Sequence, residues 1–406
     1  MNLIKRVKSL IMDRPPRWGT KRVKSNDISS IMPSSRDSSK RDQRLDFWRG
    51  LCLVDMVLVH LYYQNVQFGD FLGQLFGNYT RFAAGGFIFI SGLSIGVIFL
   101  PRAADIKRRT ATYRSLWRRS LYILAIHFVS AIVLVPILLM RDKFPTYTGP
   151  LSTLRDIFLL RDGGDLLPFY VMMVALSPFL IMAVRIPWGW LAVLCASIAT
   201  FIWGLWHPWA FAPAQHQTFP PILWQGIFIP GFLLGFAWPR YNALAQGWKI
   251  SLAGAACIFA AWMFAMEYGW QWNMKWLSFG AWFVKVPLST PEALRYLSII
   301  LAIIFTTNLI WPMMSGLSSV AFVQTLGRKS LPVYVAHLWL MEAMGALAGK
   351  WAWMGSWQIL FAVFSVLVLW LFALILDISG KPKQNARTVV SRPQMFGPEP
   401  IAGAAQ

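Results

Sequence analysis

Residues 81–100 have the sequence RFAAGGFIFISGLSIGVIFL, and residues 101–119 continue with PRAADIKRRTATYRSLWRR. The first stretch has the apolar character and the ~20 residues that a helix needs to cross a bilayer. The second stretch carries seven Arg or Lys residues and one Asp. Basic connections lie preferentially on the cytoplasmic side of a membrane. Together the two stretches predict a membrane-spanning helix that ends at a cytoplasmic connection.

The composition of the whole chain points the same way. Of its 406 residues, 56% are hydrophobic and 14% are charged, whereas a soluble domain has roughly a quarter of charged residues. An ordinary soluble enzyme is therefore excluded. Cys52, Cys195 and Cys257 lie in separate apolar runs without the paired spacing of metal ligands. We expect neither a disulfide framework nor a metal site.

Further apolar stretches resemble residues 81–100, so the sequence predicts an all-α, polytopic bundle of about ten transmembrane helices. No internal repeat of the kind found in many transporters is present. The predicted spans are 46–66, 81–100, 120–140, 166–184, 187–206, 223–239, 250–268, 294–312, 331–349 and 357–376.

An even number of spans places both termini on the same side of the membrane. The distribution of basic residues indicates that this side is the cytoplasm. The segments predicted to be cytoplasmic hold 28 basic and 7 acidic residues, and the rest of the chain is neutral. The net charge of +21 therefore reflects orientation, and nucleic acid is not needed to explain it. We expect a disordered basic tail over 1–43, a transmembrane domain over 44–376 and a second tail over 377–406. Residues 1–12 alternatively form an amphipathic helix on anionic lipid.

The first predicted span carries four ionisable residues: Asp46, Arg49, Asp55 and His60. On a helix, Arg49 and His60 lie about 20° apart in azimuth and ~16 Å apart along the axis, with Asp46 close to the same line. Asp55 lies about 140° from His60 and must find another partner. Because such groups are costly in a membrane, each is a candidate functional residue. The alternatives are an Asp46–Arg49 ion pair at the interface and a packed core histidine.

A neutral imidazole, with a pKa of ~6.5, can take a proton from a sugar hydroxyl or carry an acyl group itself. His60 is the candidate for this role. Two further histidines, His127 and His337, lie within predicted spans and either support the site or pack in the core. The glycines of the second span, Gly85, Gly86, Gly92 and Gly96, indicate close helix packing or, alternatively, a slot for an extended ligand.

Basic residues at the predicted inner surface suit a polyphosphorylated soluble cosubstrate, since Arg donates forked hydrogen bonds to phosphate. The same residues also satisfy the positive-inside rule. At the predicted outer surface, two carboxylates that flank a Gly-Gly pair are candidates for binding a polyol, or belong to a plain turn. A Trp-Gln pair at the start of a span is a second candidate, or the Trp is an ordinary anchor at the membrane interface. The cosubstrate candidates are Arg108, Arg109, Arg118, Arg119 and Arg328, and the polyol candidates are Asp162, Asp165, Trp224 and Gln225.

Six segments, in the expected order, resemble those of a known family. Arg49 and His60, with ten residues between them, match the pair that marks the first helix of the multi-pass, acyltransferase-3-like membrane acyltransferases. Val59 stands where members often have Asp, so the group that orients the imidazole stays open. The other segments are similar to the OpgC branch or to the wider superfamily. The six are RDQRLDFWRG (41–50), FIFISGLSIG (87–96), RRSLYILAIHF (118–128), LLPFYVMMVALSP (166–178), FPPILWQGIFIPGFLLG (219–235) and LGRKSLPVYVAH (326–337).

The resemblance implies an enzyme of the bacterial inner membrane that transfers an acyl group, typically succinyl from succinyl-CoA, to hydroxyls of a periplasmic glucan. Arg49 and His60 would correspond to the functional pair of the family, with Asp46 beside them. Acetyl-CoA is the alternative donor. Two rival functions remain: an O-acetyltransferase of a surface polysaccharide or lipid-linked sugar, and a transporter without chemistry.

Overall fold

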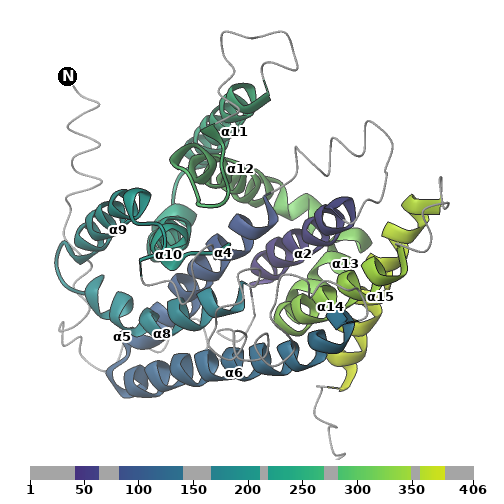
Figure 1. The fold of residues 1–406 in the computed structure, drawn as a ribbon. Helices are drawn as coiled ribbons and strands as arrows, with labels where there is room; N and C mark the ends of the chain where they lie inside the picture. Colours follow the sequence, from purple (N-terminus) through teal and green to yellow (C-terminus); the bar gives the residue numbers. More distant parts are fainter. Residues whose placement is uncertain are drawn as a thin grey trace, which may run out of the picture.

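The computed structural model describes residues 42–63, 82–139, 166–210, 218–268, 282–348 and 357–379, and these contain helices and no strand (Figure 1). A short π-helical segment, Ile95–Phe99, continues helix α4. The α-helices are α2 (Gln43–Tyr63), α4 (Ala83–Ser94), α5 (Leu100–Ala104), α6 (Ile106–Leu139), α8 (Leu167–Ala183), α9 (Gly189–Trp206), α10 (Pro221–Asn242), α11 (Gln246–Tyr268), α12 (Thr290–Met314), α13 (Ser318–Arg328), α14 (Ser330–Ala348) and α15 (Trp357–Ser379).

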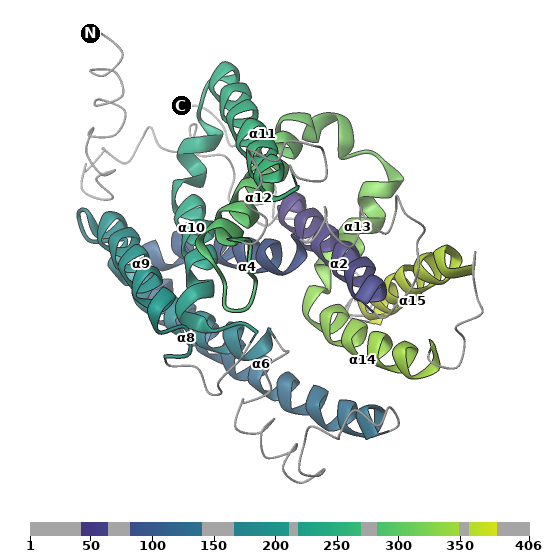
Figure 2. The ribbon, with the colours of Figure 1, turned by 45° about the horizontal axis from the view of Figure 1, so that its top comes forward.

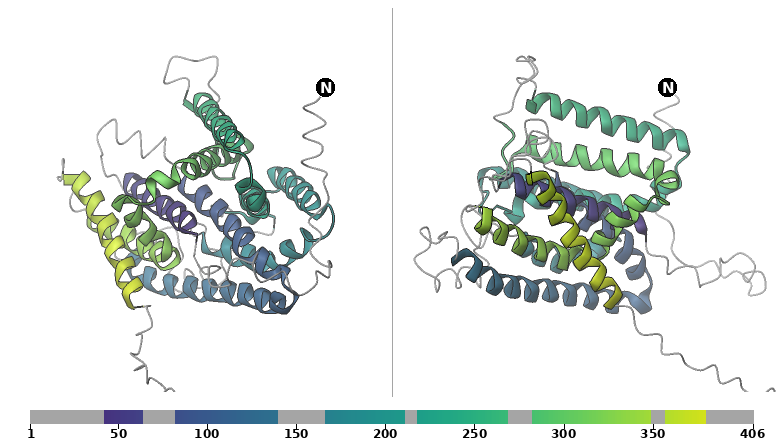
Figure 3. Two further views of the ribbon diagram at one scale, coloured as in Figure 1. Left: turned by 180° about the vertical axis from the view of Figure 1, so that it is seen from behind. Right: turned by 90° about the vertical axis from the view of Figure 1, so that its right-hand side faces the viewer.

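The predicted all-α membrane class is confirmed. Each predicted span overlaps at least one helix of the described residues, and the right-hand view of Figure 3 shows α6, α11 and α12 with nearly parallel axes. Within the described ranges, seven helical segments are long and apolar enough to cross a bilayer, and α8 is a shorter apolar helix. The seven are Ala83–Ala104, Ile106–Leu134, Gly189–Trp206, Pro221–Asn242, Gln246–Tyr268, Thr290–Met314 and Leu360–Ser379.

The outer helices present apolar side chains outward. Ile258 on α11 is 74% exposed and Leu360 on α15 is 58% exposed. In water, each exposed apolar Å² would forgo about 25 cal/mol of hydrophobic stabilisation, and patches of this kind are rare on soluble monomers. Against lipid tails the same surface costs nothing, and the helical backbone satisfies its own hydrogen bonds. The surface of the bundle is therefore a lipid-facing surface.

The centre of the bundle is formed by α4 between α2 and α10 (Figure 2). Of the most apolar window of Ala83–Ala104, 72% is buried, against 17% for α11. Glycine permits the closest contacts: a Cβ at Gly96 would lie 2.6 Å from the main-chain oxygen of Phe232 and 2.7 Å from the Cα of Gly235 on α10. The glycines of the second span thus pack helix on helix. No extended ligand fits between α4 and α10.

Two features of the fold differ from the sequence prediction. Residues 101–119, predicted as a connection, belong mostly to helix α6, because Arg, Lys, Ala and Leu are good helix formers. The carboxylate of Asp105 accepts the main-chain N–H of Lys107 at 2.9 Å and caps the start of α6. Helix α13 was not predicted, because it is too short and too polar to span a membrane. It packs on α2, where a Cβ at Gly327 would meet the main-chain oxygen of Asp46.

Candidate active site

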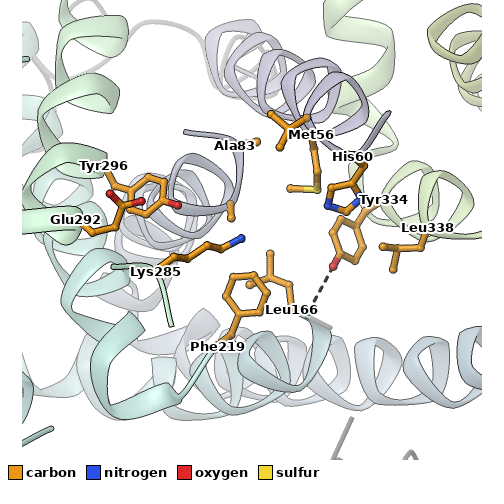
Figure 4. A pocket seen from close by; sticks show the side chains of 12 residues that line it. Met56, His60, Ala83, Leu166, Phe219, Lys285, Glu292, Tyr296, Tyr334 and Leu338 are labelled. Atoms are coloured by element: carbon orange, nitrogen blue, oxygen red, sulfur yellow. Dashed lines mark hydrogen bonds between the residues drawn. The ribbon is translucent and has the colours of Figure 1, made fainter. Parts of the chain in front are cut away.

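His60 lies on the wall of a cavity of about 80 Å³ at the end of the bundle where α2 ends and α4, α8 and α12 begin (Figure 4). Met56, one helical turn before His60, lines the same wall. One ordered water requires only ~10–15 Å³, so the cavity holds several water-sized groups. Its described lining residues are Met56, Val59, His60, Ala83, Ala84, Leu166, Phe219, Lys285, Glu292, Tyr296, Tyr334 and Leu338.

A second histidine lies against His60. The ring centroids of His60 and His337 are 5.3 Å apart, with 40° between the ring planes. His337 is fully buried, and its Nδ1 contacts the main-chain oxygen of Tyr334, one turn earlier on α14. Because a carbonyl oxygen only accepts, Nδ1 donates in this contact, which leaves Nε2 as the second ring nitrogen. Among the described residues, that Nε2 has no hydrogen-bond partner.

A buried ion network lies behind Glu292, which lines the cavity. Glu292 and Arg295, both on α12, make a bidentate pair with N–O distances of 2.7 and 2.8 Å. The Nε of Arg295 also lies 3.2 Å from a carboxylate oxygen of Glu267, at the end of α11. Arg295 has no exposed surface. Two carboxylates therefore share one guanidinium, and Lys285 brings a further positive charge to the cavity that Glu292 also lines.

Asp46, Arg49 and Asp55, the other ionisable residues predicted as candidates on α2, have partners within α2 or on α4. A guanidinium N–H of Arg49 donates to the hydroxyl of Ser94 on α4 at 2.6 Å, and Asp46 lies 3.8 Å from Arg49. Asp55 accepts the main-chain N–H of Ala83 at 3.0 Å, at the start of α4. Arg49 therefore lies near the end of α4, whereas His60 lies near its start. Asp46 pairs with Arg49 within α2, Asp55 attaches α2 to the start of α4, and His60 faces the cavity.

Four of the five predicted cosubstrate arginines lie on α6, and the fifth, Arg328, lies on α13. Arg118 and Arg119 lie exposed near the start of α6, as does Arg108, which faces Asp105 at 3.4 Å. Arg109 is half-buried and donates to the main chain of Ala103 at 3.3 Å. Three of the four α6 arginines are therefore exposed, in the half of α6 that follows α5, and Arg109 is bound to the main chain of α5.

Arg328, the fifth predicted cosubstrate arginine, ends helix α13. It donates to Thr325 at 2.9 Å and lies 3.6 Å from Asp377 on α15. Lys329 lies 3.9 Å from the same carboxylate. Arg328 thus joins α13 to α15 through the carboxylate of Asp377.

Trp224 and Gln225, predicted to bind a polyol, lie inside the helix packing. The indole N–H of Trp224 donates to the main chain of Thr218 at 3.1 Å, and its ring supports Phe219 and Tyr296, which line the cavity. The amide of Gln225 accepts from the hydroxyl of Ser197 at 2.6 Å and donates to the main chain of α9 and α10. Trp224 therefore supports the cavity wall from behind, and Gln225 links α9 to α10.

The remaining predicted residues lie elsewhere. Asp162 and Asp165 fall outside the described residues. His127 is buried on α6, with its ring 5.8 Å from that of Phe128, and does not line the cavity. No group of three or more His, Cys, Asp or Glu side chains in the described ranges is placed to hold a metal ion.

Sequence reasoning missed Lys285 and Glu292, which line the cavity, and the ion network behind Glu292. Arg295 falls inside the predicted span 294–312, Glu292 lies just before it, and Glu267 lies at the end of the span 250–268. Ionisable residues at such positions are functional candidates by the same rule that selected His60. The i, i+3 spacing of Glu292 and Arg295 was a further signal of a pair.

An all-helical bundle with a lipid-facing surface and a histidine pair at an internal cavity defines an integral membrane protein with an embedded polar site. Residues 41–380 match the family described as OpgC protein, so the chain belongs to the OpgC family. Membership indicates a membrane acyltransferase that modifies glucans. Comparisons with curated proteins and with solved structures find no match.

Proposed function

We propose that this chain transfers a succinyl group from cytoplasmic succinyl-CoA to a hydroxyl of a periplasmic glucan, across the bacterial inner membrane. The observation that carries the proposal is the position of His60 on the cavity wall, next to His337. A neutral imidazole facing a small internal cavity is suited to general-base catalysis on a hydroxyl. The OpgC family supplies the class of reaction.

The proposed chemistry exchanges a C–S bond for a C–O bond and moves one proton from the sugar hydroxyl to the sulfur. His60 takes the proton of the glucan hydroxyl while the hydroxyl oxygen attacks the carbonyl carbon of the thioester. The new C–O bond forms the ester, the C–S bond breaks, and the thiolate of coenzyme A takes the proton from His60. The imidazole returns to its neutral state. Cavity walls such as Met56 and Leu166 limit the water that would compete with the sugar for the acyl group.

His337 is the proposed positioning residue for His60. No Asp precedes His60, since residue 59 is Val. The ring of His337 packs against His60 and is itself fixed by the main chain of Tyr334. Such a packed, hydrogen-bonded neighbour restricts the orientation of the catalytic ring, and precise orientation is a large part of catalysis.

The basic start of α6 is the proposed landing surface for the phosphates of coenzyme A. Arg108, Arg118 and Arg119 are exposed there, and Arg matches the oxygen atoms of phosphate with paired donors. The expected orientation places this surface in the cytoplasm, where acyl-CoA is made, and the cavity toward the periplasm, where the glucan lies. Donor and acceptor would thus approach from opposite ends of the bundle.

Reconstitution tests this proposal. The purified chain in liposomes, supplied with glucan and succinyl-CoA, should release coenzyme A and yield glucan that carries the heavier, anionic succinyl increment by mass spectrometry. With acetyl-CoA alone, little product should form. Exclusive acetylation would support the O-acetyltransferase alternative, and release of coenzyme A without any modified glucan would contradict the proposed acceptor.

A further inference from the structure

We propose that Arg109 and Arg185 bind the phosphate group of an anionic phospholipid. The two residues meet at the last turn of the short helix α5, where the start of α6 and the turn between α8 and α9 come together. Neither residue lines the cavity of His60, so this lipid site is separate from the proposed site of acyl transfer.

Two guanidinium groups converge on one main-chain oxygen. The Nε of Arg109, on α6, donates to the main-chain oxygen of Ala103 at 3.3 Å, and an N–H of Arg185 donates to the same oxygen at 2.8 Å. Because both nitrogens touch the same oxygen, they lie within about 6 Å of each other. A guanidinium has several N–H donors and each uses one here, so both arginines retain donors for a second acceptor that they can share.

The positive charge at this point has no carboxylate against it within the described part of the chain. Residues 100–139 and 166–206 hold eight Arg or Lys residues and one acidic residue, Asp105. The carboxylate of Asp105 caps the start of α6 and lies 3.4 Å from Arg108. Arg109 and Arg185 are therefore two like charges held close together, and their repulsion is relieved when an anion binds to both. Phosphate suits this place, because its oxygens match the paired donors of arginine.

The surroundings of Arg185 favour the phosphate of a lipid over that of a soluble molecule. Ile186 and Trp188 follow Arg185 in the turn and are both exposed, and so is Phe179 on α8. A basic residue beside exposed Trp and aliphatic side chains is typical of the level of the lipid headgroups. Basic sites between helices on the cytoplasmic side of a membrane bind anionic headgroups. The phosphate would contact both guanidinium groups, and the acyl chains of the lipid would cover the apolar surface of α8 and α9.

The test is a lipid titration of the full-length protein in detergent, followed by native mass spectrometry. The wild-type protein should bind phosphatidylglycerol more tightly than phosphatidylcholine. The double variant Arg109→Gln, Arg185→Gln should bind phosphatidylglycerol roughly tenfold more weakly, because it lacks both phosphate contacts. The control is the double variant Arg240→Gln, Lys249→Gln, which removes two exposed positive charges near the connection of α10 and α11 and should bind like the wild-type protein.

Three results would overturn the lipid site. They are undiminished phosphatidylglycerol binding by the folded Arg109/Arg185 variant, an equal loss in the control variant, and equal affinity of the wild-type protein for the two lipids. Weaker binding of coenzyme A with intact lipid binding would assign the two arginines to a soluble phosphate and contradict the proposal. If the Gln variant does not fold, Arg185→Lys replaces it. That variant keeps the charge and loses the paired donors, so it should weaken phosphatidylglycerol binding several-fold, and unchanged binding would refute the site.

Discussion

The ring of His60, on the first helix of the described chain, lies 5.3 Å from the ring of His337, on α14. The two residues come from opposite ends of the sequence, and each occupies a helix that contacts the other's helix. His60 lines the cavity, whereas His337 is fully buried behind it and bonds the main chain of Tyr334. His60 is therefore the histidine that faces the cavity, and His337 packs against it from behind.

Replacing His337 should lower kcat without changing KM for either substrate. We expect His337→Phe to lower kcat by more than about tenfold, because the catalytic ring loses its oriented neighbour. His337→Gln keeps an N–H that can bond the main-chain oxygen of Tyr334, and should restore part of the activity. Steady-state kinetics of the two variants check the prediction. Equal loss in both, or a loss confined to KM, would assign His337 a purely structural role.

Arg295 should be essential for folding. Its removal leaves Glu267 and Glu292 without their shared guanidinium, and an uncompensated buried charge costs about 3–5 kcal/mol. We expect Arg295→Met to lower the thermal midpoint of the purified protein sharply. Arg240→Met, at the exposed end of α10, is the control and should leave that midpoint unchanged. A stable Arg295→Met variant would show that the network contributes little to the fold.

The contact between α4 and α10 predicts a strong effect of one added methyl group. Gly96→Ala would place a Cβ 2.6 Å from a main-chain oxygen of α10, so the helices must separate. Overpacking of this kind costs about 1–3 kcal/mol. Gly254→Ala on α11 has no heavy atom within 4 Å and should be neutral or stabilising. Thermal unfolding in detergent compares the two, and equal midpoints would contradict the close packing.

The exposed arginines of α6 should affect the binding of acyl-CoA and leave the rate of the chemical step unchanged. We expect the double variant Arg118→Gln, Arg119→Gln to raise KM for acyl-CoA several-fold at unchanged kcat, since exposed ion pairs are individually weak. Added salt should raise the wild-type KM in the same way, through screening. Arg240→Gln is the control for loss of a single positive charge elsewhere. An unchanged KM in the double variant would place coenzyme A at another surface.

The periodicity of the sequence was sufficient to predict the features of the site that depend on a single helix. The apolar stretches located the helices, and the azimuth on α2 separated His60 from Asp55. In the structure, His60 faces the cavity and Asp55 bonds the start of α4. Both results depend only on the geometry of one helix, which the sequence determines. The basic stretch 101–119 was located as well, although its helical conformation was not predicted.

The assembled cavity could not be predicted from one sequence. His337 and Lys285 reach the cavity through the packing of α14 on α2 and through the segment before α12. Such long-range contacts leave no periodic signal along the chain. Gln225 shows the opposite case. Its position at the start of a span suggested that it binds a ligand, whereas in the structure its amide bonds Ser197 on α9. Burial and partners, which are properties of the fold, decide between these roles.

The most direct test of the account is acyl transfer by a His60→Ala variant. The variant should insert into the membrane and have the same thermal midpoint as the wild-type protein, because it removes a side chain at a cavity wall. It should nevertheless transfer no succinyl group to glucan. His207→Ala, at the exposed end of α9, should retain full activity. Wild-type transfer by a folded His60→Ala protein would contradict the central claim that His60 activates the glucan hydroxyl.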